Sequence, residues 1–177
     1  MNYLGIDKAS ISNGPGVRVV LWVSGCKMQC KGCHNKESWN FNAGKLFDDN
    51  AKQGLFNALD KPYIRGITLS GGHPLEYENL PEIYDLTKEI KEKYPNKDIW
   101  LYTSYVLSTN DFDRSVDIGW DNSLLRNCIL TMCDVVVDGP YIEEQRDITI
   151  KFRGSKNQRL IDVKETLKQG KVITIQN

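Results

Sequence analysis

The sequence lacks a long hydrophobic run. Although 40% of its 177 residues are hydrophobic, nowhere do about eighteen apolar residues follow one another, as a membrane-spanning helix requires. The first twenty residues contain Asp7, Lys8 and Arg18 and hold no apolar stretch of the length found in secretory signal peptides. We therefore expect a cytoplasmic protein with no membrane partner.

The sequence also lacks an excess of charge of either sign. Its 23 Lys and Arg residues balance its 23 Asp and Glu residues, so no overall field attracts an anionic polymer. We therefore expect no nucleic-acid partner. A length of 177 residues is sufficient for one hydrophobic core and short for two, so we expect a single domain over residues 1–177.

Cysteine is scarce and unevenly placed. The chain has five cysteines, an odd number, and a disulfide framework is not expected in a reducing compartment. Cys26, Cys30 and Cys33 stand within eight residues in the segment GCKMQCKGCHN. Such a cluster indicates metal binding, whereas we expect Cys128 and Cys133, which stand apart, to be small buried side chains.

Three kinds of metal site compete for this segment. A structural zinc site can take three thiolates and the following histidine, His34. The string Cys30–His34 also has the C-x-x-C-H spacing of c-type haem attachment, but covalent haem normally belongs to exported proteins. The third kind is an iron–sulfur cluster held by the three cysteines, with one iron left without a protein ligand.

The spacing favours the iron–sulfur cluster. Structural zinc sites usually draw two pairs of ligands from two separate turns, and no second C-x-x-C or H-x-x-x-H motif follows here. His34 is adjacent to Cys33, so closing one tetrahedron with both side chains is strained. A cuboidal cluster has separate corners for three thiolates of one loop, and its open iron is a site for chemistry. A zinc-binding interaction module is the alternative from a different class.

The pattern of apolar residues predicts an α/β fold. Runs rich in β-branched and aromatic residues alternate with segments of helical periodicity, which is typical of parallel βαβ units. Asn79 and Pro81 predict the start of one helix, and Pro95 lies beyond its end. We expect strands at 17–23, 66–70, 98–103, 133–137 and 172–175, a strand pair at 148–152 and 159–163, and helices at 47–59, 79–94, 122–128 and 164–169, the last closed by Gly170.

Four loops of unusual composition follow the predicted strands. They are the cysteine loop, SGGHPL (70–75), TSY (103–105) and DGPY (138–141). Ligand sites of parallel α/β folds lie at the carboxyl ends of the strands, and right-handed crossovers bring loops at that end together. We therefore expect these four loops to form one site.

At this point the motifs resemble a known family. The cysteine spacing after the first predicted strand is similar to that of radical S-adenosylmethionine (SAM) enzymes, and GGHPL resembles their GGEP or GGDP turn. More narrowly, NGPG, SGC, CKGCHNKESWN, LSGGHPL, KDIW, VVVDG and RGSKNQR resemble, in order and spacing, the activating proteins of anaerobic ribonucleotide reductase. These blocks extend from Asn13 to Arg159, so the resemblance covers most of the chain.

The resemblance implies a fold, two cofactors and two protein partners. The fold is a partial (incomplete) TIM-type βα barrel, and the cofactors are a [4Fe-4S] cluster and SAM. Reductive cleavage of SAM gives methionine and a 5′-deoxyadenosyl radical, which takes a hydrogen atom from a backbone glycine of the reductase large subunit. The other partner is a one-electron donor protein such as a flavodoxin. An alternative within the same superfamily is an enzyme that acts on a small molecule.

The resemblance also implies roles for individual residues, with the cofactors carrying the chemistry and no side chain acting as general acid or base. The cluster ligands are Cys26, Cys30 and Cys33, and the backbone from Gly32 through Cys33 to His34 lies against the nucleoside. Gly71 and Gly72 turn carbonyl oxygens toward the methionyl ammonium, and Pro74 stiffens the turn. Thr103 or Ser104 donates to the carboxylate, and Asp138 or the loop 153–157 contacts ribose or adenine.

Two residues depart from the family pattern. His34 stands where the activating proteins usually have tyrosine, and His73 replaces an acidic residue after the double glycine. A neutral imidazole can accept only one hydrogen bond and a protonated one repels an ammonium group. We therefore expect weaker or more pH-sensitive SAM binding, which a His73→Asp variant tests between about pH 6 and pH 8.

The size of the chain suits a large substrate. A length of 177 residues accommodates only a few βα units, which leaves little protein to enclose a small molecule beside the cofactor. We therefore expect an open lateral face into which the glycine loop of the reductase enters.

Overall fold

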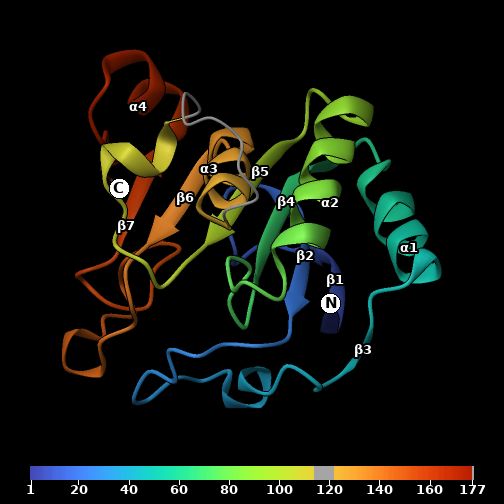
Figure 1. Cartoon of the computed structure of the whole chain (residues 1–177), viewed down its shortest axis with the longest axis horizontal. Coiled ribbons are helices and arrows are strands. Elements are labelled where there is room, and N and C mark those ends of the chain that lie inside the picture. Colours follow the sequence, from blue (N-terminus) through green and yellow to red (C-terminus); the bar gives the residue numbers. More distant parts are fainter. Residues whose placement is uncertain (114–121, 177) are drawn as a thin grey trace.

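The computed structural model describes residues 1–113 and 122–176 as an α/β fold (Figure 1). Within these residues a seven-stranded mixed sheet has the order β3-β1-β2-β4-β5-β6-β7, accompanied by four α-helices. The strands are β1 (Asn2–Ser10), β2 (Val17–Val23), β3 (Lys45–Leu46), β4 (Ile64–Gly71), β5 (Asp98–Tyr102), β6 (Val135–Asp138) and β7 (Arg159–Asp162). The helices are α1 (Asp49–Leu59), α2 (Leu80–Lys93), α3 (Asn122–Met132) and α4 (Val163–Gln169).

The centre of the sheet is parallel. Strands β2, β4, β5 and β6 are parallel neighbours, while β1, β3 and β7 pair antiparallel at the two edges. Strand β2 has the sequence VRVVLWV, and its interior is buried on both faces, as expected of a strand in a covered parallel sheet. The predicted α/β class and its mostly parallel sheet are therefore confirmed.

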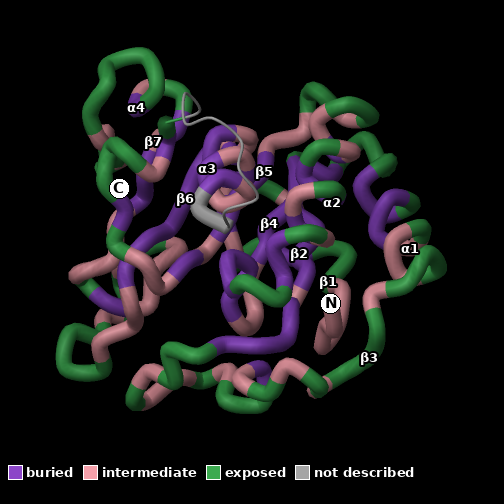
Figure 2. The backbone as a smooth tube through the Cα atoms, in the orientation of Figure 1, coloured by how far each residue is buried: buried purple, intermediate pink, exposed green. Residues whose placement is uncertain are grey.

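The two faces of the sheet are covered differently. Val19 and Leu21 of β2 point into the main core, which also contains apolar side chains of α1, α2 and α3. Trp22 follows the core residue Leu21 in β2, and Tyr102 follows the core residue Leu101 in β5. Both aromatic side chains therefore belong to the opposite face of the sheet, where they line the cavity described below. A smaller cluster around Trp100 covers part of that face. Figure 2 shows the buried residues concentrated along the central strands and the sides of the helices that face them.

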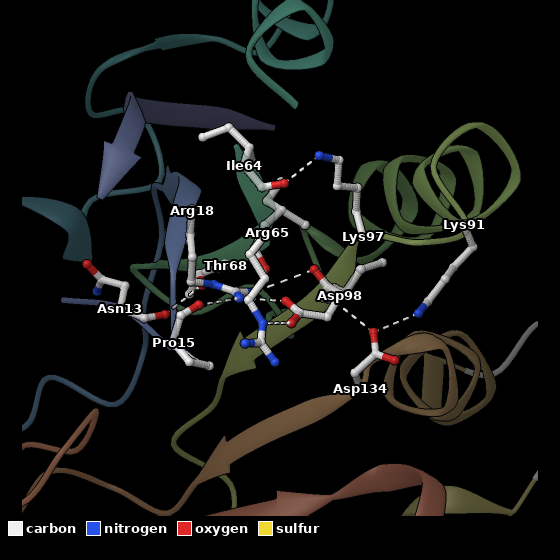
Figure 3. A network of polar contacts seen from close by, with 12 residues as sticks. Asn13, Pro15, Arg18, Ile64, Arg65, Thr68, Lys91, Lys97, Asp98 and Asp134 are labelled. Atoms are coloured by element: carbon white, nitrogen blue, oxygen red, sulfur yellow. Dashed lines mark hydrogen bonds and ion pairs between the residues drawn. The ribbon is translucent and has the colours of Figure 1, made fainter. Parts of the chain in front are cut away.

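A buried arginine joins the amino ends of the central strands (Figure 3). Arg18 of β2 is fully buried and donates to Thr68 Oγ1 at 2.9 Å and to the Ile67 carbonyl at 2.7 Å, both in β4. Its Nη1 lies 2.5 Å from Asp98 Oδ1 in β5, and Arg65 Nε donates to the other oxygen of Asp98 at 2.9 Å. This network therefore cross-links three strands at the end opposite to the predicted site.

Two predicted strands are wrong. Residues 148–152 form turns, because Asp147 Oδ1 accepts from the Thr149 backbone N–H at 2.9 Å and Ile148 is left 84% exposed. Strand β7 pairs instead with β6, antiparallel. Residues 172–175 form no strand, only an isolated bridge between Ile161 and Thr174.

The amino-terminal strand was not predicted. Strand β1 pairs with β2, but its sequence, NYLGIDKAS, includes a glycine and a polar second half that is exposed up to Ser10. The pairing also has register irregularities between Tyr3 and Gly5 and between Asp7 and Ser10. These features weaken the alternation that identifies a strand in sequence.

The helices agree with the prediction apart from their boundaries. Asp48 caps α1 by accepting from the Ala51 N–H at 2.9 Å, and Gly170 ends α4 in the left-handed conformation. Helix α3 extends four residues past the predicted end at Cys128, to Met132. Residues 114–121 lie outside the described residues. Among the described helices, none has both the length and the apolar composition needed to span a membrane.

Candidate functional site

A cavity of about 570 Å³ lies at the carboxyl ends of the central strands. It is reached by the loops that follow β2, β4, β5 and β6, so the predicted convergence of four loops is confirmed. The lining residues that were predicted from the sequence are Cys26, Cys30, Cys33, His34, Gly71, Gly72, His73, Thr103, Ser104, Arg153 and Gly154.

The cysteine loop has an unusual backbone. Gly25 has φ of +94°, and a Cβ at this position would lie 2.1 Å from the ring of Phe41. Gln29, between the first two cysteines, has φ of +44°, which is uncommon for a residue other than glycine. The Gly25 N–H donates to the Ser38 carbonyl at 2.7 Å. The loop is therefore folded back against the segment that follows it.

The three cysteine side chains share one cavity. Cys26 is 8% exposed, and Cys30 and Cys33 are half-buried. Burial raises the pKa of the Cys26 thiol, an effect that backbone N–H groups of Met28 and Gln29 oppose. Such N–H groups stabilise a thiolate, the form in which cysteine binds metal.

The donor set fits an iron–sulfur cluster. In residues 1–113 and 122–176 no group of three or more His, Cys, Asp or Glu side chains is gathered as closely as a single metal ion requires. The three thiols are instead distributed along the wall of one cavity. Three thiols on one cavity wall supply ligands for three corners of a [4Fe-4S] cluster, which leaves one iron open.

The loop after β4 is hydrogen-bonded to the cysteine loop. The Gly72 N–H donates to the Val23 carbonyl at 2.7 Å, and the His73 N–H donates to the Gly25 carbonyl at 2.8 Å. A Cβ on Gly72 would lie 2.5 Å from the Gly25 carbonyl oxygen, and one on Gly71 would lie 2.6 Å from the Val23 backbone nitrogen. The double glycine is therefore required for the two loops to approach each other.

Two asparagines hold these loops in place, and the sequence did not identify either role. Asn79 was predicted to cap α2, but its side chain makes no capping bond. Its Nδ2 donates instead to the carbonyls of Ser24 at 2.9 Å and His73 at 3.2 Å. Asn35 Nδ2 donates to the Gly71 carbonyl at 3.4 Å. Both side chains therefore tie the cysteine loop to the double-glycine loop.

His73 is a buried member of a hydrogen-bonded chain. It is 1% exposed, its Nδ1 lies 3.2 Å from Glu76 Oε1, and its Nε2 lies 2.7 Å from Thr103 Oγ1. Burial raises the pKa of Glu76, but hydrogen bonds from His73 and from the Lys27 N–H outweigh burial and leave that pKa below its ordinary value of 4.5. The edge of Tyr105 packs against the imidazole, with the ring centroids 4.5 Å apart.

Aromatic side chains form much of the remaining wall. Trp22, Trp39, Tyr102, Tyr141 and Phe152 all line the cavity, and the sequence analysis had placed only Tyr141, in the loop DGPY, at the site. Flat apolar rings of this kind can stack on a purine base. The one usable signal was in β2, where Trp22 alternates with the core positions, but a continuous apolar run does not reveal which face is open.

Two predicted residues lie apart from the main cavity. Asp138 does not line it, because its carboxylate is fully buried, accepts from the Leu107 N–H at 2.8 Å and forms an ion pair with Arg159. The adjacent Gly139 lines the cavity instead. Gly32 lines a neighbouring cavity of about 350 Å³, which also contains His34 and Arg153.

The segment 139–158 lies beside the cysteine loop. Lys31 Nζ lies 3.0 Å from Glu144 Oε1 and 3.8 Å from Glu143 Oε2 across this contact. On the other side of the loop, Lys27 Nζ lies 2.7 Å from Glu78 Oε1. These two lysines are therefore paired with carboxylates. Cys133 is buried and Cys128 half-buried, so the prediction of full burial is correct for Cys133 only.

The fold and the three-cysteine cavity define the chain as an iron–sulfur domain. In agreement, the family model described as a 4Fe-4S single cluster domain matches residues 12–161. Relatives include the anaerobic ribonucleoside-triphosphate reductase-activating proteins of Haemophilus influenzae, 40% identical over 89% of this chain and 96% of that protein, and of bacteriophage T4, 41% identical over 90% and 93%. The protein of the same name from Escherichia coli K12 is 36% identical over 89% of this chain and 96% of its own length. The chain belongs to the family of anaerobic ribonucleoside-triphosphate reductase-activating proteins.

Proposed function

We propose that this protein activates an anaerobic ribonucleotide reductase by generating a glycyl radical on it. The observation that carries the proposal is the convergence of Cys26, Cys30 and Cys33 with the Gly71-Gly72 turn on one cavity. The family membership supports the reductase as the protein on which the activity is exerted.

Different parts of the cavity hold the two cofactors. Cys26, Cys30 and Cys33 bind a [4Fe-4S] cluster, and the aromatic wall with the adjacent loops binds SAM. When bound by these residues, the cluster would supply the single electron for reductive cleavage of SAM into methionine and a deoxyadenosyl fragment that takes up hydrogen. Transfer of a hydrogen atom from a backbone glycine of the reductase to that fragment would give 5′-deoxyadenosine and the stored glycyl radical.

The protein contributes the positioning of the cofactors rather than proton transfer. The hydrogen bonds from Gly72 and His73 to the cysteine loop fix the distance between the two cofactor-binding loops. Asn35 and Asn79 reinforce that distance. Holding reactants in a fixed geometry is a large part of what an enzyme adds to a cofactor that already carries the reactive chemistry.

We further propose that residues 1–177 form one domain, a partial barrel of the radical SAM type. Two features support it: helices cover the face of the sheet that carries Val19 and Leu21, and the cavity lies over the face that carries Trp22 and Tyr102. The electron is delivered by a one-electron donor protein such as a flavodoxin.

Anaerobic reconstitution followed by electron paramagnetic resonance tests the proposal. The reconstituted protein is mixed with a reductant, SAM and an anaerobic ribonucleotide reductase, and a glycyl doublet on the reductase is the expected result. A Cys30→Ser variant should give no doublet. A colourless protein that holds zinc without acid-labile sulfide, or cleavage of SAM that turns over a free small molecule and never marks the reductase, would refute the proposal.

A further inference from the structure

The carboxylate that the sequence lacks after the double glycine is present three residues later. Glu76 is 4% exposed, is not among the residues lining the cavity, and lies directly behind His73. Among the described residues that line the cavity, only Asp7 carries a carboxylate. Asp7 lies in β1 and pairs with Val20, which is well before the carboxyl end of β2. The negative charge near the double-glycine turn is therefore separated from the cavity by His73.

With Glu76 ionised and the His73 ring neutral, each of the two hydrogen bonds can run in one direction only. An ionised carboxylate only accepts, so His73 Nδ1 must carry a hydrogen in order to bond Glu76 at 3.2 Å. In a neutral imidazole the other nitrogen, Nε2, is then an acceptor, and the Thr103 hydroxyl donates to it at 2.7 Å. The charge of Glu76 is in this way connected through His73 to Thr103.

The hydrogen-bonding capacity of Thr103 is then nearly used up. In this arrangement its Oγ1 donates to His73 Nε2, and it accepts from the Tyr105 N–H at 3.2 Å. A hydroxyl has one donor and two acceptor positions, so one acceptor position is left. Thr103 lines the cavity, and what it can offer a ligand there is a lone pair polarised by the chain behind it.

From this arrangement we infer that Thr103 Oγ1 accepts a hydrogen bond from the methionyl ammonium group of SAM, and that Glu76 and His73 are positioning residues for it. The inference rests on the proposed function for the identity of the ligand. It reverses the expectation that Thr103 donates to the methionyl carboxylate. It also gives His73 a role that an acidic residue at position 73 would fill by direct contact.

Ligand discrimination by the cluster-loaded protein tests the inference. Binding of SAM is compared with binding of an analogue in which hydrogen replaces the methionyl ammonium group, with the cluster oxidised so that no cleavage occurs. Thr103→Val should weaken SAM binding about ten- to a hundredfold, as expected for loss of a hydrogen bond to a charged group, and leave the analogue unchanged. Thr103→Ser keeps the hydroxyl and should retain the preference for SAM.

Two further variants separate the inference from simpler explanations. Glu76→Gln removes the charge but keeps the size, and should lower the preference for SAM over the analogue. Asp7→Asn removes the carboxylate of β1 and should leave that preference unchanged. Equal weakening of both ligands by Thr103→Val, or loss of the preference in Asp7→Asn alone, would overturn the inference while the proposed function stands. Failure of the parent protein to bind SAM would instead refute the proposed function, and the inference with it.

A nitrogen-15 spectrum of the full chain provides a readout independent of any ligand. The chain has only two histidines, so a His34→Gln variant assigns the ring signals of His73. The inferred hydrogen bonds require a hydrogen on Nδ1 of His73 and none on Nε2, and the spectrum should show this arrangement. A doubly protonated ring would leave the Thr103 hydroxyl free to donate to a carboxylate, and would overturn the inference.

Discussion

At the scale of single residues, the double glycine matters because it has no side chains, which lets two backbone segments approach closely. Gly72 has no positive φ, so a side chain there is excluded by contact alone: a Cβ would lie 2.5 Å from the carbonyl oxygen of Gly25. This contact is between two backbones, and neither can move without breaking the bonds that join the cysteine loop to the loop after β4. The spacing of the thiols therefore depends on a residue that binds no metal.

A Gly72→Ala variant tests this dependence. We expect it to lose roughly 1–3 kcal/mol of unfolding free energy, since overpacking at a fixed backbone contact forces a local shift, and to retain less iron and sulfide after reconstitution. Gly54→Ala in α1 is the matched control, because a Cβ there meets nothing within 4 Å. It should stabilise the protein by about 0.5–1 kcal/mol and keep its cluster. Equal cluster content in the two variants would contradict the argument.

Glu76 makes the stability of the protein depend on pH. Its pKa in the folded protein lies below the ordinary value of 4.5, because hydrogen bonds from His73 and the Lys27 N–H outweigh the opposing effect of burial. A carboxyl whose pKa is lower in the folded state stabilises the fold above its unfolded pKa and loses that contribution as the pH falls through the folded value.

Urea unfolding of the parent and of Glu76→Gln measures this contribution. The parent should be the more stable protein at pH 7, and the difference should shrink as the pH falls below about 4.5. Glu37→Gln, a change at an exposed side chain of the same type, controls for the loss of one negative charge. A difference that stays constant from pH 7 to pH 3 would show that Glu76 acts through packing alone.

At the scale of elements, the sheet separates stability from chemistry. Arg18, Thr68 and Asp98 join β2, β4 and β5 at their amino ends (Figure 3), whereas the cysteines and glycines occupy the carboxyl ends. Asp134, just before β6, extends the network by accepting from the Ile99 N–H at 2.8 Å and from Lys91 at 2.7 Å. A substitution in the polar network at the amino ends can therefore destabilise the fold without replacing any residue of the site at the carboxyl ends.

Replacing Asp98 with asparagine should be strongly destabilising. Arg18 is fully buried, and burial already lowers its pKa while Asp98 opposes that effect. Removing the partner leaves a buried charge uncompensated, which costs roughly 3–5 kcal/mol. Arg65→Met removes an exposed arginine from the same carboxylate and should cost less than about 1 kcal/mol. Equal losses in the two variants, measured by chemical denaturation, would contradict this account.

The sequence predicted the elements that are strongly patterned. Strands β2, β4, β5 and β6 are short apolar runs bounded by turn residues, and helix α2 has a clear apolar face ending before Pro95. Strand β1 was missed because its sequence has no clear alternation of apolar and polar residues, and its strand conformation depends on pairing with β2. Residues 148–152 were mistaken for a strand because Ile148 and Ile150 alternate with polar residues in a segment that forms turns.

The site was predictable where its chemistry is local in sequence. Cys26, Cys30 and Cys33 are neighbours in the chain, so their spacing alone indicated a cluster. The partnership of His73 with Thr103 joins residues 30 positions apart, and it requires the β4–β5 pairing before it can be recognised. The aromatic wall was missed for the same reason, since it collects side chains from several separate segments.

At the scale of the whole molecule, exposed apolar side chains border the cavities. Met28 in the cysteine loop is 40% exposed, Ile11 beside the lining residue Ser12 is 76% exposed, and Ile148 on the smaller cavity is 84% exposed. Large apolar side chains in contact with water at the edge of a site are suited to a protein partner. The open lateral face expected from the length of the chain stays a prediction.

Hydrogen exchange with and without the reductase tests where that partner binds. Binding should slow exchange in the cysteine loop and in residues 139–158, and leave α1 unchanged. Ile148→Asp should weaken the complex about tenfold, as expected when one apolar contact at an interface is lost, whereas Leu46→Asp in β3 should not. Protection confined to α1 and α2 would place the partner on the wrong face.

The antiparallel direction of β7 sets a limit on how this architecture can be enlarged. A further strand–helix repeat cannot be added next to β6, because β7 already occupies that edge in the opposite direction. New covering for the cavity must therefore come from longer connections, such as residues 139–158, or from a second polypeptide. A fold whose sheet ends in an antiparallel edge strand therefore favours a site that is completed by the surface of its protein substrate.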